Sequence, residues 1–295
     1  MRDFFPGLAG IPAAKSSISF VDGSKGILEY RGIRIEDLAL HSSFLETTFL
    51  LLFKRLPAKS ELARFTGDIS HHRRIEHRII DLLKLLPKQG HPMDALQAAV
   101  AALGMFYPAP HVREEPTRYL TAVRLVAKLP TIIAAFARLR QGDESIQPRD
   151  DLSFAGNFLY MLTDQIPNPD WVKIFDVCLI LHAEHTMNAS TFSGMVTAST
   201  LADPYTVISS AIGTLKGSLH GGANEAVIHM LEEINSEDRL PAYIVNKLSS
   251  KEKIMGFGHR IYKVKDPRAI VMQAFAQQLD SPRDTQSLYT LARAV

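Results

Sequence analysis

The sequence predicts a mainly or entirely α-helical protein that carries one small β-hairpin near its N-terminus. Apolar residues recur at helical spacing through most of the chain, and residues 16–31 give the only convincing strand signal. The segments 188–202 and 204–218 are rich in Ala, Ser, Gly and Thr. Small residues let helices approach one another closely, so we expect these two segments at the centre of the molecule.

The hairpin is predicted from apolar residues on both sides of a turn that contains glycine. Asp22-Gly23 and Gly26 form the turn, and Phe20 and Ile27 flank it. Everything after the hairpin is predicted to be helical. The expected helices cover about 44–56, 60 onward, 73–86, 93–107, 117–141, 153–163, 170–183, 188–202, 204–218, 223–234, 241–249, 266–279 and 284 onward.

Prolines and small polar residues set several of the predicted helix ends. Pro57 ends the first helix, and Ser60 is expected to N-cap the second. Pro130 should bend or break the long helix over 117–141. The segment 93–107 carries no charge after Asp94, so we expect it to be buried in a core or an interface.

Two glycines interrupt the helical pattern at Gly221-Gly222 and indicate a domain boundary. We therefore predict a large helical domain over residues 1–220 and a small helical domain over residues 221–295. A cleft between two such domains is a natural place for a ligand to bind.

Composition excludes several classes of protein. Of the 295 residues, 46% are hydrophobic and 22% charged, as in ordinary globular proteins, and the formal net charge is only +2. No basic tract is long enough to favour nucleic acid, and no apolar run reaches the ~18 residues that a bilayer requires. The N-terminus has neither a signal-peptide nor a transit-peptide pattern, so a cytoplasmic location is expected. Cys178, the only cysteine, cannot form an internal disulfide.

The most informative stretch lies at residues 253–268. It contains a Gly256-Phe257-Gly258-His259 loop followed by Lys263, Lys265 and Arg268. The glycines allow backbone shapes that a side chain would forbid, so the loop can present an imidazole to a ligand. The nearby cations suit an anion, and arginine can bind a carboxylate through two hydrogen bonds. We interpret His259 and Arg268 as residues that bind a small carboxylate substrate.

Two further histidines, His182 and His185, are three residues apart and share a helix face if their helix continues. Three interpretations stay open: hydrogen-bonded core histidines, substrate-binding histidines, or metal ligands. The metal interpretation is the weakest, because the His-Glu-x-x-His pattern of zinc hydrolases is missing and no third ligand is evident.

A fourth histidine, His220, is followed by Gly221-Gly222 and the start of a helix. This pattern predicts backbone N–H groups that are free beside an imidazole, which would favour an anion or a polarised oxygen. The alternative is a tight turn between helices. Because imidazoles donate hydrogen bonds to carbonyls and transfer protons near neutral pH, the histidines together indicate carbonyl chemistry on an anionic substrate.

Several motifs, in this order along the chain, resemble those of the citrate synthases. They are Gly7-Leu8-Ala9-Gly10, Ser19-Phe20-Val21-Asp22-Gly23, Leu28-Glu29-Tyr30-Arg31-Gly32, Ala127-Lys128-Leu129-Pro130-Thr131, Asn157-Phe158-Leu159-Tyr160-Met161-Leu162, Leu181-His182-Ala183-Glu184-His185, Asn188-Ala189-Ser190, Leu219-His220-Gly221-Gly222-Ala223-Asn224-Glu225-Ala226, Gly256-Phe257-Gly258-His259-Arg260-Ile261-Tyr262 and Asp266-Pro267-Arg268. The resemblance covers essentially the whole chain. It is strongest in the three motifs that contain His185, His220 and His259, and three long motifs in the right order are highly specific.

The resemblance implies a mostly helical homodimer, often built further into hexamers, whose subunits have a large domain and a small domain that closes over the substrates. It implies an acyl transfer in which acetyl-CoA condenses with oxaloacetate and citryl-CoA is hydrolysed to citrate and CoA. CoA would be a co-substrate, and no permanently bound cofactor or metal is expected.

The same resemblance implies roles for individual residues. His220 would hydrogen-bond the thioester carbonyl and stabilise the enolate of acetyl-CoA, which makes removal of a weakly acidic methyl proton feasible. His259 would polarise the ketone of oxaloacetate and protonate the new alkoxide. His185 and Arg268 would bind oxaloacetate, with Asn188 beside them in the substrate site.

The glycine loop would bind CoA. In the family, the backbone of this loop carries the adenine, which here assigns Met255, Gly256 and Gly258 to CoA binding. Lys263 would lie near a CoA phosphate.

Two departures from the family pattern stand out. Thr186 occupies a position where the family commonly has glutamate. The base of the family is an aspartate in an Asn-Val-Asp-Phe-Tyr-like motif downstream of Asp-Pro-Arg, and this sequence contains no such motif. Asp266, Asp280 and Asp284 lie in no matching motif. We therefore expect a citrate synthase that is truncated at its C-terminus and inactive or nearly so, with a small domain that lacks its return to the large domain.

Three alternatives remain. A 2-methylcitrate synthase shares these motifs and prefers propionyl-CoA. A non-catalytic assembly module would use the helical core alone. A zinc hydrolase built on His182 and His185 is the most distant.

Overall fold

The computed structural model of the chain describes residues 10–109, 113–259, 261–277 and 283–294. Arg260 and the segment Gly7-Leu8-Ala9 of the first motif lie outside these residues, as does Asp280. The elements are β1 (Ser19–Asp22), β2 (Ile27–Tyr30), β3 (Ile33–Arg34), α1 (Ile35–His41), α2 (Phe44–Phe53), α3 (Lys59–His71), α4 (His77–Leu85), α5 (Pro92–Phe106), α6 (Glu115–Gln141), α7 (Phe154–Thr163), α8 (Pro169–His182), α9 (Ala189–Ser199), α10 (Pro204–Leu215), α11 (Gly222–Ile234), η2 (Glu237–Arg239), α12 (Leu240–Ser249), α13 (Pro267–Ala276) and α14 (Arg283–Ala294).

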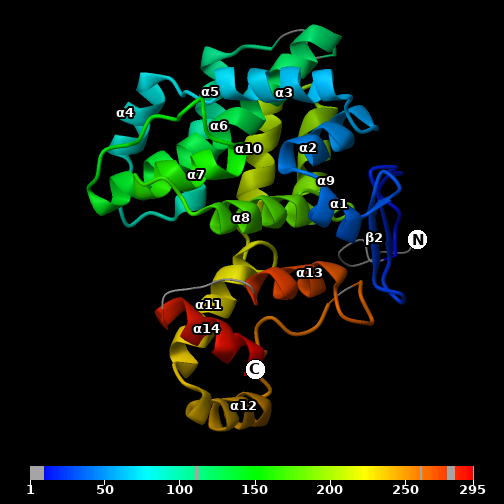
Figure 1. Cartoon of the computed structure of the whole chain (residues 1–295), viewed down its shortest axis with the longest axis vertical. Helices are drawn as coiled ribbons and strands as arrows, with labels where there is room; N and C mark the ends of the chain where they lie inside the picture. Colours follow the sequence, from blue (N-terminus) through cyan, green and yellow to red (C-terminus); the bar gives the residue numbers. More distant parts are fainter. Residues whose placement is uncertain (1–9, 110–112, 260, 278–282, 295) are drawn as a thin grey trace, which may run out of the picture.

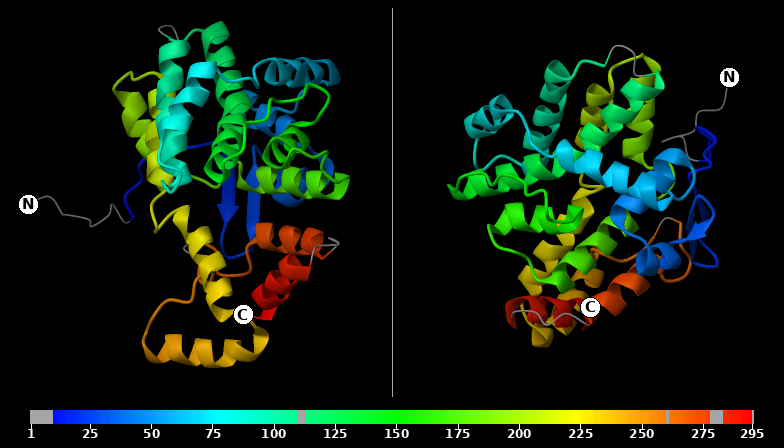
Figure 2. Two further views of the ribbon diagram at one scale, coloured as in Figure 1. Left: turned by 90° about the vertical axis from the view of Figure 1, so that its left-hand side faces the viewer. Right: turned by 45° about the horizontal axis from the view of Figure 1, so that its top comes forward.

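The helical fold class and the N-terminal hairpin are confirmed. Strands β1 and β2 pair antiparallel, with Ser19 opposite Tyr30 and Asp22 opposite Ile27, and β3 adds a short third strand that was not predicted. The small sheet stands beside α1 at one side of the molecule (Figure 1). Helices α11, α12, α13 and α14 lie below the other helices in Figure 1, and Figure 2 shows the same arrangement.

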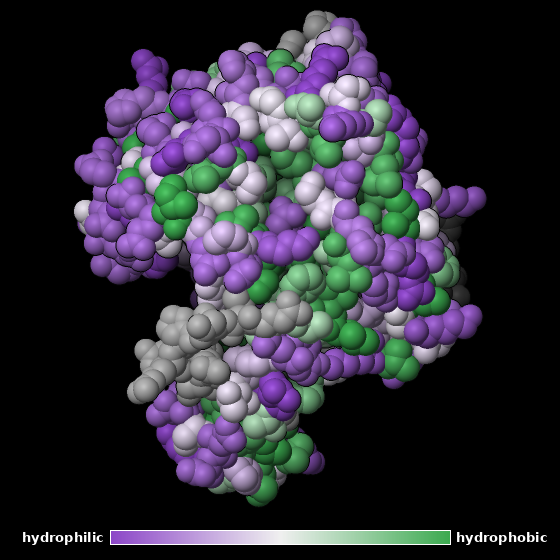
Figure 3. Space-filling model, in the orientation of Figure 1, coloured by the Kyte–Doolittle hydropathy of each residue, from purple (hydrophilic) through white to green (hydrophobic). Residues whose placement is uncertain are grey.

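Three apolar clusters hold helices α1 to α8, α10 and α13 together. One joins α4, α5, α6 and α10, and a second joins α2, α3, α6 and α7. The third joins β2, α1, α8 and α13, so the hairpin and α13 share one core although they are more than 200 residues apart in sequence. In the space-filling view, hydrophobic side chains also reach the surface at the level of α1, α8 and α13 (Figure 3).

Helix α6 has the length and apolar composition of a membrane span, unlike any other helix of the described residues. It nevertheless packs against α3, α4, α5 and α7, and its apolar residues Val123, Ile132 and Phe136 are buried among them. We therefore interpret α6 as a core helix. The sequence predicts a bend or a break at Pro130; the helix continues through this proline, so the break is wrong, and the bend stays a prediction.

Two predicted helix starts are also wrong. Helix α3 is N-capped by Ala58 rather than Ser60, because the Glu61 carboxylate accepts the backbone N–H of Ala58 at 2.8 Å. Helix α4 begins at His77 and not at residue 73. Arg73 is buried in the preceding loop, where its guanidinium donates to the carbonyls of Arg149 and Leu152 at 3.0 and 2.9 Å.

The two helices rich in small residues occupy different positions. Helix α10 packs between α5 and α9, as expected for a central helix. Helix α9 buries only Gly194 among the residues that the structure describes in it, so its predicted central place is wrong. Its outer face exposes Phe192, Met195 and Val196.

The chain changes its packing partners after residue 221. Met230, Leu231 and Ile234 of α11 form a separate apolar cluster with Leu291 of α14. Helix α13, in contrast, packs on α1 and α8. The division into domains 1–220 and 221–295 stays a prediction.

A buried lysine makes the stability of this core depend on pH. Lys128 of α6 is 3% exposed, and its ammonium donates to the carbonyl of Arg74 and lies 4.9 Å from the centre of the Tyr107 ring. Burial lowers the pKa of Lys128 to about 8 from its ordinary value of 10.5. The unfolded chain therefore binds one more proton than the folded chain between these two values, so stability from this group rises with pH in that window.

We expect Lys128→Met to remove this dependence. In denaturant titrations, the free energy of unfolding of the unmodified chain should gain roughly 1–2 kcal/mol from Lys128 between pH 8 and pH 10, and the variant should lack that gain. Lys84→Met, at an exposed position of α4, is the control and should keep the pH dependence. An equal gain in Lys128→Met would contradict the assignment.

Candidate active site

The structure brings the aromatic rings of His185, His259 and Tyr262 together. The ring centres of His185 and His259 are 5.7 Å apart, and that of Tyr262 lies 5.5 Å from His185 and 4.7 Å from His259. The Tyr262 hydroxyl is 3.1 Å from Nε2 of His185. These residues come from the turn after α8 and the loop before α13, so two distant motifs of the sequence form one cluster.

The β-hairpin holds the turn that carries His185. The buried Tyr30 hydroxyl lies 3.1 and 3.3 Å from the carbonyls of Ile180 and Leu181 at the end of α8, and it accepts the N–H of Glu184 at 3.2 Å. Ser19 donates to the Glu184 carboxylate at 2.9 Å. The turn is thus fixed to the sheet by side chains that our sequence analysis did not select.

The next residue of this turn adopts an unusual backbone conformation. Thr186 has a φ of 63°, which β-branched residues rarely adopt, and its N–H donates to the Ser19 hydroxyl at 3.2 Å. Such conformations persist where the surroundings hold them, and they are common at functional sites. Because α8 ends at His182, the helix does not continue to His185, and the two histidines do not share a helix face.

The glycine loop orients His259 through the backbone. Gly256 and Gly258 have φ values of 86° and 81°, so glycine is needed at both. Nδ1 of His259 accepts the N–H groups of Ile261 and Tyr262, each at 3.0 Å. A neutral His259 ring must therefore carry its proton on Nε2, which leaves Nε2–H as a hydrogen-bond donor.

Asp266 and Arg268 place a charged pair beside the rings. Asp266 N-caps α13, and the Arg268 guanidinium donates to both of its carboxylate oxygens, with Nη2 at 2.7 Å and Nε at 3.1 Å. Burial raises the pKa of Asp266, but hydrogen bonds from Arg268 outweigh burial and lower the pKa overall. The carboxylate therefore stays ionised, and Nε2 of His259 lies 3.8 Å from it.

The electrostatics of the cluster keep His185 neutral. Burial, and after it the charge of Arg268, lowers the pKa of His185 to about 4. Burial and the nearby Asp266 raise the pKa of Tyr262 to about 12, so the phenol keeps its proton at neutral pH. Two imidazoles and one guanidinium thus lie close together, and they can donate hydrogen bonds to the carbonyl and carboxylate oxygens of an anion.

A metal ion is chemically possible at this cluster but not at the predicted histidine pair. His185, His259 and Asp266 offer ligand atoms that all lie within 4.8 Å of one another. His182 lies at the exposed end of α8, where its Nδ1 donates to the carbonyl of Cys178 at 2.7 Å. A zinc site built on His182 and His185 is therefore not supported.

His220 lies in a tight turn between α10 and α11. Gly221 donates its N–H to the carbonyl of Leu215 at 2.9 Å, and Gly222 donates to that of Gly217 at 3.3 Å. The expectation of free backbone N–H groups here is wrong, because the turn itself uses them. The Nε2 atom of His220 is 2.8 Å from the hydroxyl of Ser190.

The remaining predicted residues make other contacts in the part of the chain that the structure describes. Asn188 uses its side-chain oxygen to cap α9, where it accepts the N–H of Thr191 at 2.9 Å. Lys263 is exposed, and its backbone N–H donates to the carbonyl of Gly23 at 2.7 Å. Met255 packs against the α11 cluster.

Sequence reasoning missed Tyr262, Asp266 and Ser190 as partners of the histidines. For Tyr262 a signal existed, since it follows His259 by three residues in the same motif. Ser190 and His220 meet only in the folded chain, so no local pattern in the sequence predicts their contact.

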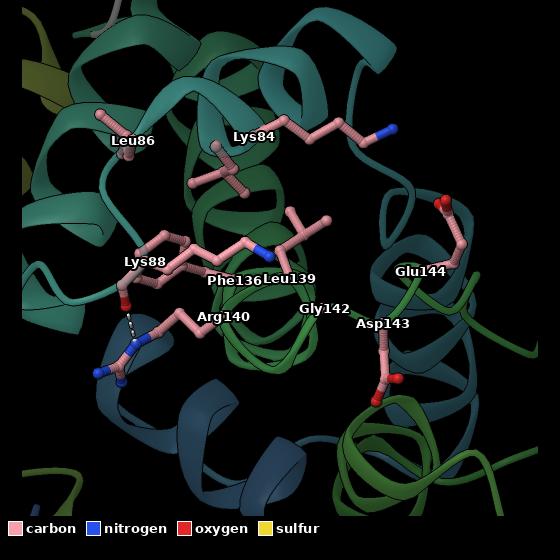
Figure 4. A pocket seen from close by; sticks show the side chains of 10 residues that line it. Lys84, Leu86, Lys88, Phe136, Leu139, Arg140, Gly142, Asp143 and Glu144 are labelled. Carbon is pink, nitrogen blue, oxygen red and sulfur yellow. Dashed lines mark hydrogen bonds between the residues drawn. The ribbon is translucent and has the colours of Figure 1, made fainter.

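A pocket of about 190 Å³ lies elsewhere, between α4 and the C-terminal end of α6. Figure 4 shows Lys88 and Arg140 on one side of it, with Nε of Arg140 donating to the Lys88 carbonyl at 2.8 Å. Asp143 and Glu144 also line it, so its charges are mixed and favour no particular ligand.

The charge of Arg268 should be visible in the titration of His185. We expect Arg268→Gln to raise the pKa of His185 from about 4 toward its ordinary value of 6.5, since the variant removes a nearby cation and leaves Asp266 unneutralised. NMR titration of the histidine ring signals measures this change. Lys263→Gln removes an exposed cation of the same segment and should leave His185 unaffected; an equal rise in both variants would refute the assignment to Arg268.

The sequence of the chain is similar to sequences of known proteins. A family model described as citrate synthase, C-terminal domain, matches residues 7–295. A citrate synthase of Synechocystis sp. is 57% identical over 291 residues, which cover 98% of this chain and 73% of that protein. A citrate synthase of Deinococcus radiodurans is 43% identical over 295 residues, which cover 100% of this chain and 78% of that protein.

Solved structures agree with the sequence comparison. The crystal structure of citrate synthase from Pyrobaculum aerophilum matches with a TM-score of 0.92 at 39% identity, covering 99% of this chain and 75% of that one. A citrate synthase from Thermoplasma acidophilum, solved as a ternary complex with carboxymethyl coenzyme A and oxaloacetate, matches with a TM-score of 0.94 at 29% identity, covering 100% and 78%. This chain therefore belongs to the citrate synthase family and has its mostly helical fold.

Proposed function

We propose that the cluster of His185, His259 and Arg268 binds oxaloacetate for condensation with acetyl-CoA. The observation that carries the proposal is the geometry of this cluster, in which one guanidinium and two imidazoles from separate motifs lie close together. Oxaloacetate is a ketone with two carboxylates, so it needs cationic and hydrogen-bonding partners of this kind. The ternary complex of the Thermoplasma relative with oxaloacetate and carboxymethyl coenzyme A supports the assignment.

The chemistry follows from the tautomer of His259. Its Nε2–H would donate to the ketone oxygen of oxaloacetate, draw electron density from the carbon and then protonate the alkoxide that forms. Arg268 would bind a carboxylate of the substrate while Asp266 keeps the guanidinium in place. Neutral His185 would add a hydrogen bond without the cost of burying another charge.

Acetyl-CoA would approach from the opposite side of the substrate. His220 would donate to the thioester oxygen as the enolate develops, and Ser190 would orient its ring through the hydrogen bond at Nε2. We assign the CoA moiety to the backbone of Met255, Gly256 and Gly258, with Lys263 near a phosphate and Asn188 at the edge of the substrate site.

The proposal includes the two domains predicted from sequence. His220 lies at the junction of residues 1–220 and 221–295, whereas His259 and Arg268 belong to the second part. A movement of one part against the other would bring the two halves of the site together and exclude water until condensation is complete. A cytoplasmic location stays a prediction.

We further propose that these 295 residues bind substrate but do not complete the reaction. The reaction needs a base for the methyl proton of acetyl-CoA, and the sequence contains no Asn-Val-Asp-Phe-Tyr-like motif to supply it. A 2-methylcitrate synthase is the alternative activity, and comparison of acetyl-CoA with propionyl-CoA in a longer chain that carries the aspartate motif decides between them.

Calorimetric titration tests substrate binding. The chain should bind oxaloacetate, and His259→Ala should weaken binding roughly tenfold to a hundredfold, since a hydrogen bond to a charged or strongly polarised group is worth about 1.5–3 kcal/mol. His182→Ala changes a histidine outside the cluster and should bind like the unmodified chain. Equal affinity in His259→Ala would count against the proposed site.

A thiol-release assay tests the absence of turnover. Chain purified away from host enzyme should release no CoA from acetyl-CoA and oxaloacetate, because it lacks the base. Steady release of thiol, lost in His259→Ala, would show that another group removes the proton.

The exposed apolar face of α9 supports a homo-oligomer. Val196 of α9 is 54% exposed, Leu201 just after α9 is 71% exposed, and Met105 at the end of α5 is 85% exposed; α5 and α9 both pack on α10. Such a patch commonly marks a protein interface. We therefore propose that α9 and the end of α5 meet the same elements of a second copy in a dimer; hexamers remain a prediction.

Charge introduced into this face should separate the copies. Val196→Asp is expected to weaken dimerisation at least roughly tenfold, as measured by analytical ultracentrifugation, because a carboxylate would be buried without a partner. Leu85→Asp adds the same charge at a position of α4 that is 83% exposed, and it should leave the association unchanged. Unaltered dimers of Val196→Asp would place the interface elsewhere.

A further inference from the structure

The turn of the N-terminal hairpin lies directly against the loop that carries His259. Gly23 accepts the backbone N–H of Lys263 at 2.7 Å. A Cβ atom added at Gly26 would lie 3.0 Å from the side chain of Val264. The hairpin and this loop, more than 200 residues apart in sequence, also meet side by side in Figure 1. The contact therefore joins the N-terminal hairpin, the first element of the described residues, to the candidate active site.

Gly23 makes the closest approach in this contact. A Cβ atom at this position would lie 2.1 Å from the carbonyl oxygen of Ile261 and 2.7 Å from its carbonyl carbon. Real Cβ atoms do not come so close to a backbone. The φ angle of Gly23 lies outside the left-handed region, unlike that of Gly26 at 66°. Glycine is thus required at position 23 for space and not for backbone conformation.

The backbone that Gly23 touches is the backbone that orients His259. The N–H groups of Ile261 and Tyr262 both donate to Nδ1 of His259 and so determine which ring nitrogen carries the proton. The Tyr262 hydroxyl in turn lies within hydrogen-bond distance, 3.1 Å, of Nε2 of His185. A displacement of Ile261 by a fraction of an ångström would change the hydrogen bonds of both histidines.

The turn of the hairpin does not itself depend on this contact. Asp22 closes the turn, because its Oδ1 accepts the N–H groups of Ser24 and Lys25 at 3.0 and 3.2 Å and the Ser24 hydroxyl at 2.6 Å. We expect an alanine at position 23 to leave these bonds in place, because none of them uses an atom of Gly23. The consequence of such a change therefore falls on the loop at Ile261.

We propose that Gly23 is a positioning residue of the active site. Because Gly23 has no side chain, the hairpin turn packs directly against Ile261, and this contact holds His259 in its Nε2–H tautomer. The proposal concerns the geometry of the histidines; only its consequence for oxaloacetate rests on the proposed function. Misplacement of a reacting group by about 1 Å can lower the rate of a reaction about a hundredfold, so a contact that holds the position of His259 affects catalysis.

The experiment compares Gly23→Ala with Gly67→Ala. Gly67 lies in α3, where an added Cβ atom meets no atom within 4 Å, so the same substitution there is the matched control. Nitrogen NMR of histidine-labelled chain reads the tautomer. The unmodified chain and Gly67→Ala should show His259 with its proton on Nε2, and Gly23→Ala should show a mixture of both tautomers.

Hydrogen exchange gives a second readout of the same change. The amides of Ile261 and Tyr262 should exchange at least roughly tenfold faster in Gly23→Ala, whereas amides of α5 and α10 should not change. An unaltered tautomer with unaltered exchange overturns the proposal. Loss of cooperative unfolding in Gly23→Ala overturns it too, since the glycine would then serve the fold and not the site.

Oxaloacetate titration separates this proposal from the function on which its consequence rests. Gly23→Ala should bind oxaloacetate roughly tenfold more weakly or worse, with Gly67→Ala unaffected. Failure of the unmodified chain to bind oxaloacetate would refute the proposed function, and the tautomer of His259 would still decide the role of Gly23. Normal binding in Gly23→Ala, with a displaced tautomer, would refute the consequence for substrate.

Discussion

One buried hydroxyl group supports the arrangement on which the active site depends. Tyr30 of the hairpin lies against the last carbonyls of α8 and accepts the N–H of Glu184, so it satisfies the backbone at the point where the helix ends. The chain then turns sharply, with Thr186 in a strained conformation that Ser19 helps to hold. His185 takes its position from this turn. The hairpin, which makes up little of the fold, thereby fixes one side of the site.

The same hairpin reaches the other side of the site through its turn. Gly23 meets the loop between His259 and Lys263, while β2 meets the end of α8. The hairpin therefore contacts both of the segments that carry His185 and His259. Rigid support of this kind is what a site needs if its groups are to stay within a fraction of an ångström of their working geometry.

Charge is distributed so that the His185 imidazole remains uncharged beside a cation. Arg268 forms an ion pair with Asp266. Burial lowers the pKa of His185 most, and the charge of Arg268 lowers it further. A neutral imidazole can donate to a carbonyl and accept the proton back, whereas a second buried cation would be costly. Burial likewise lowers the pKa of Lys128 in α6.

The sequence by itself determined the helical class, the hairpin, and the Gly-x-Gly-His loop, because helical periodicity and glycine-rich turns are local properties of the chain. It also identified His185, His259 and Arg268 as candidates. It did not predict the late start of α4, which the buried Arg73 contacts explain, or the cap at Ala58. Only the tertiary structure decided that Tyr262 and Asp266 join the histidines, that the amides beside His220 are already used, and that Gly23 seats the loop. These are contacts between residues far apart in sequence or bonds within a folded turn, and no periodicity records them.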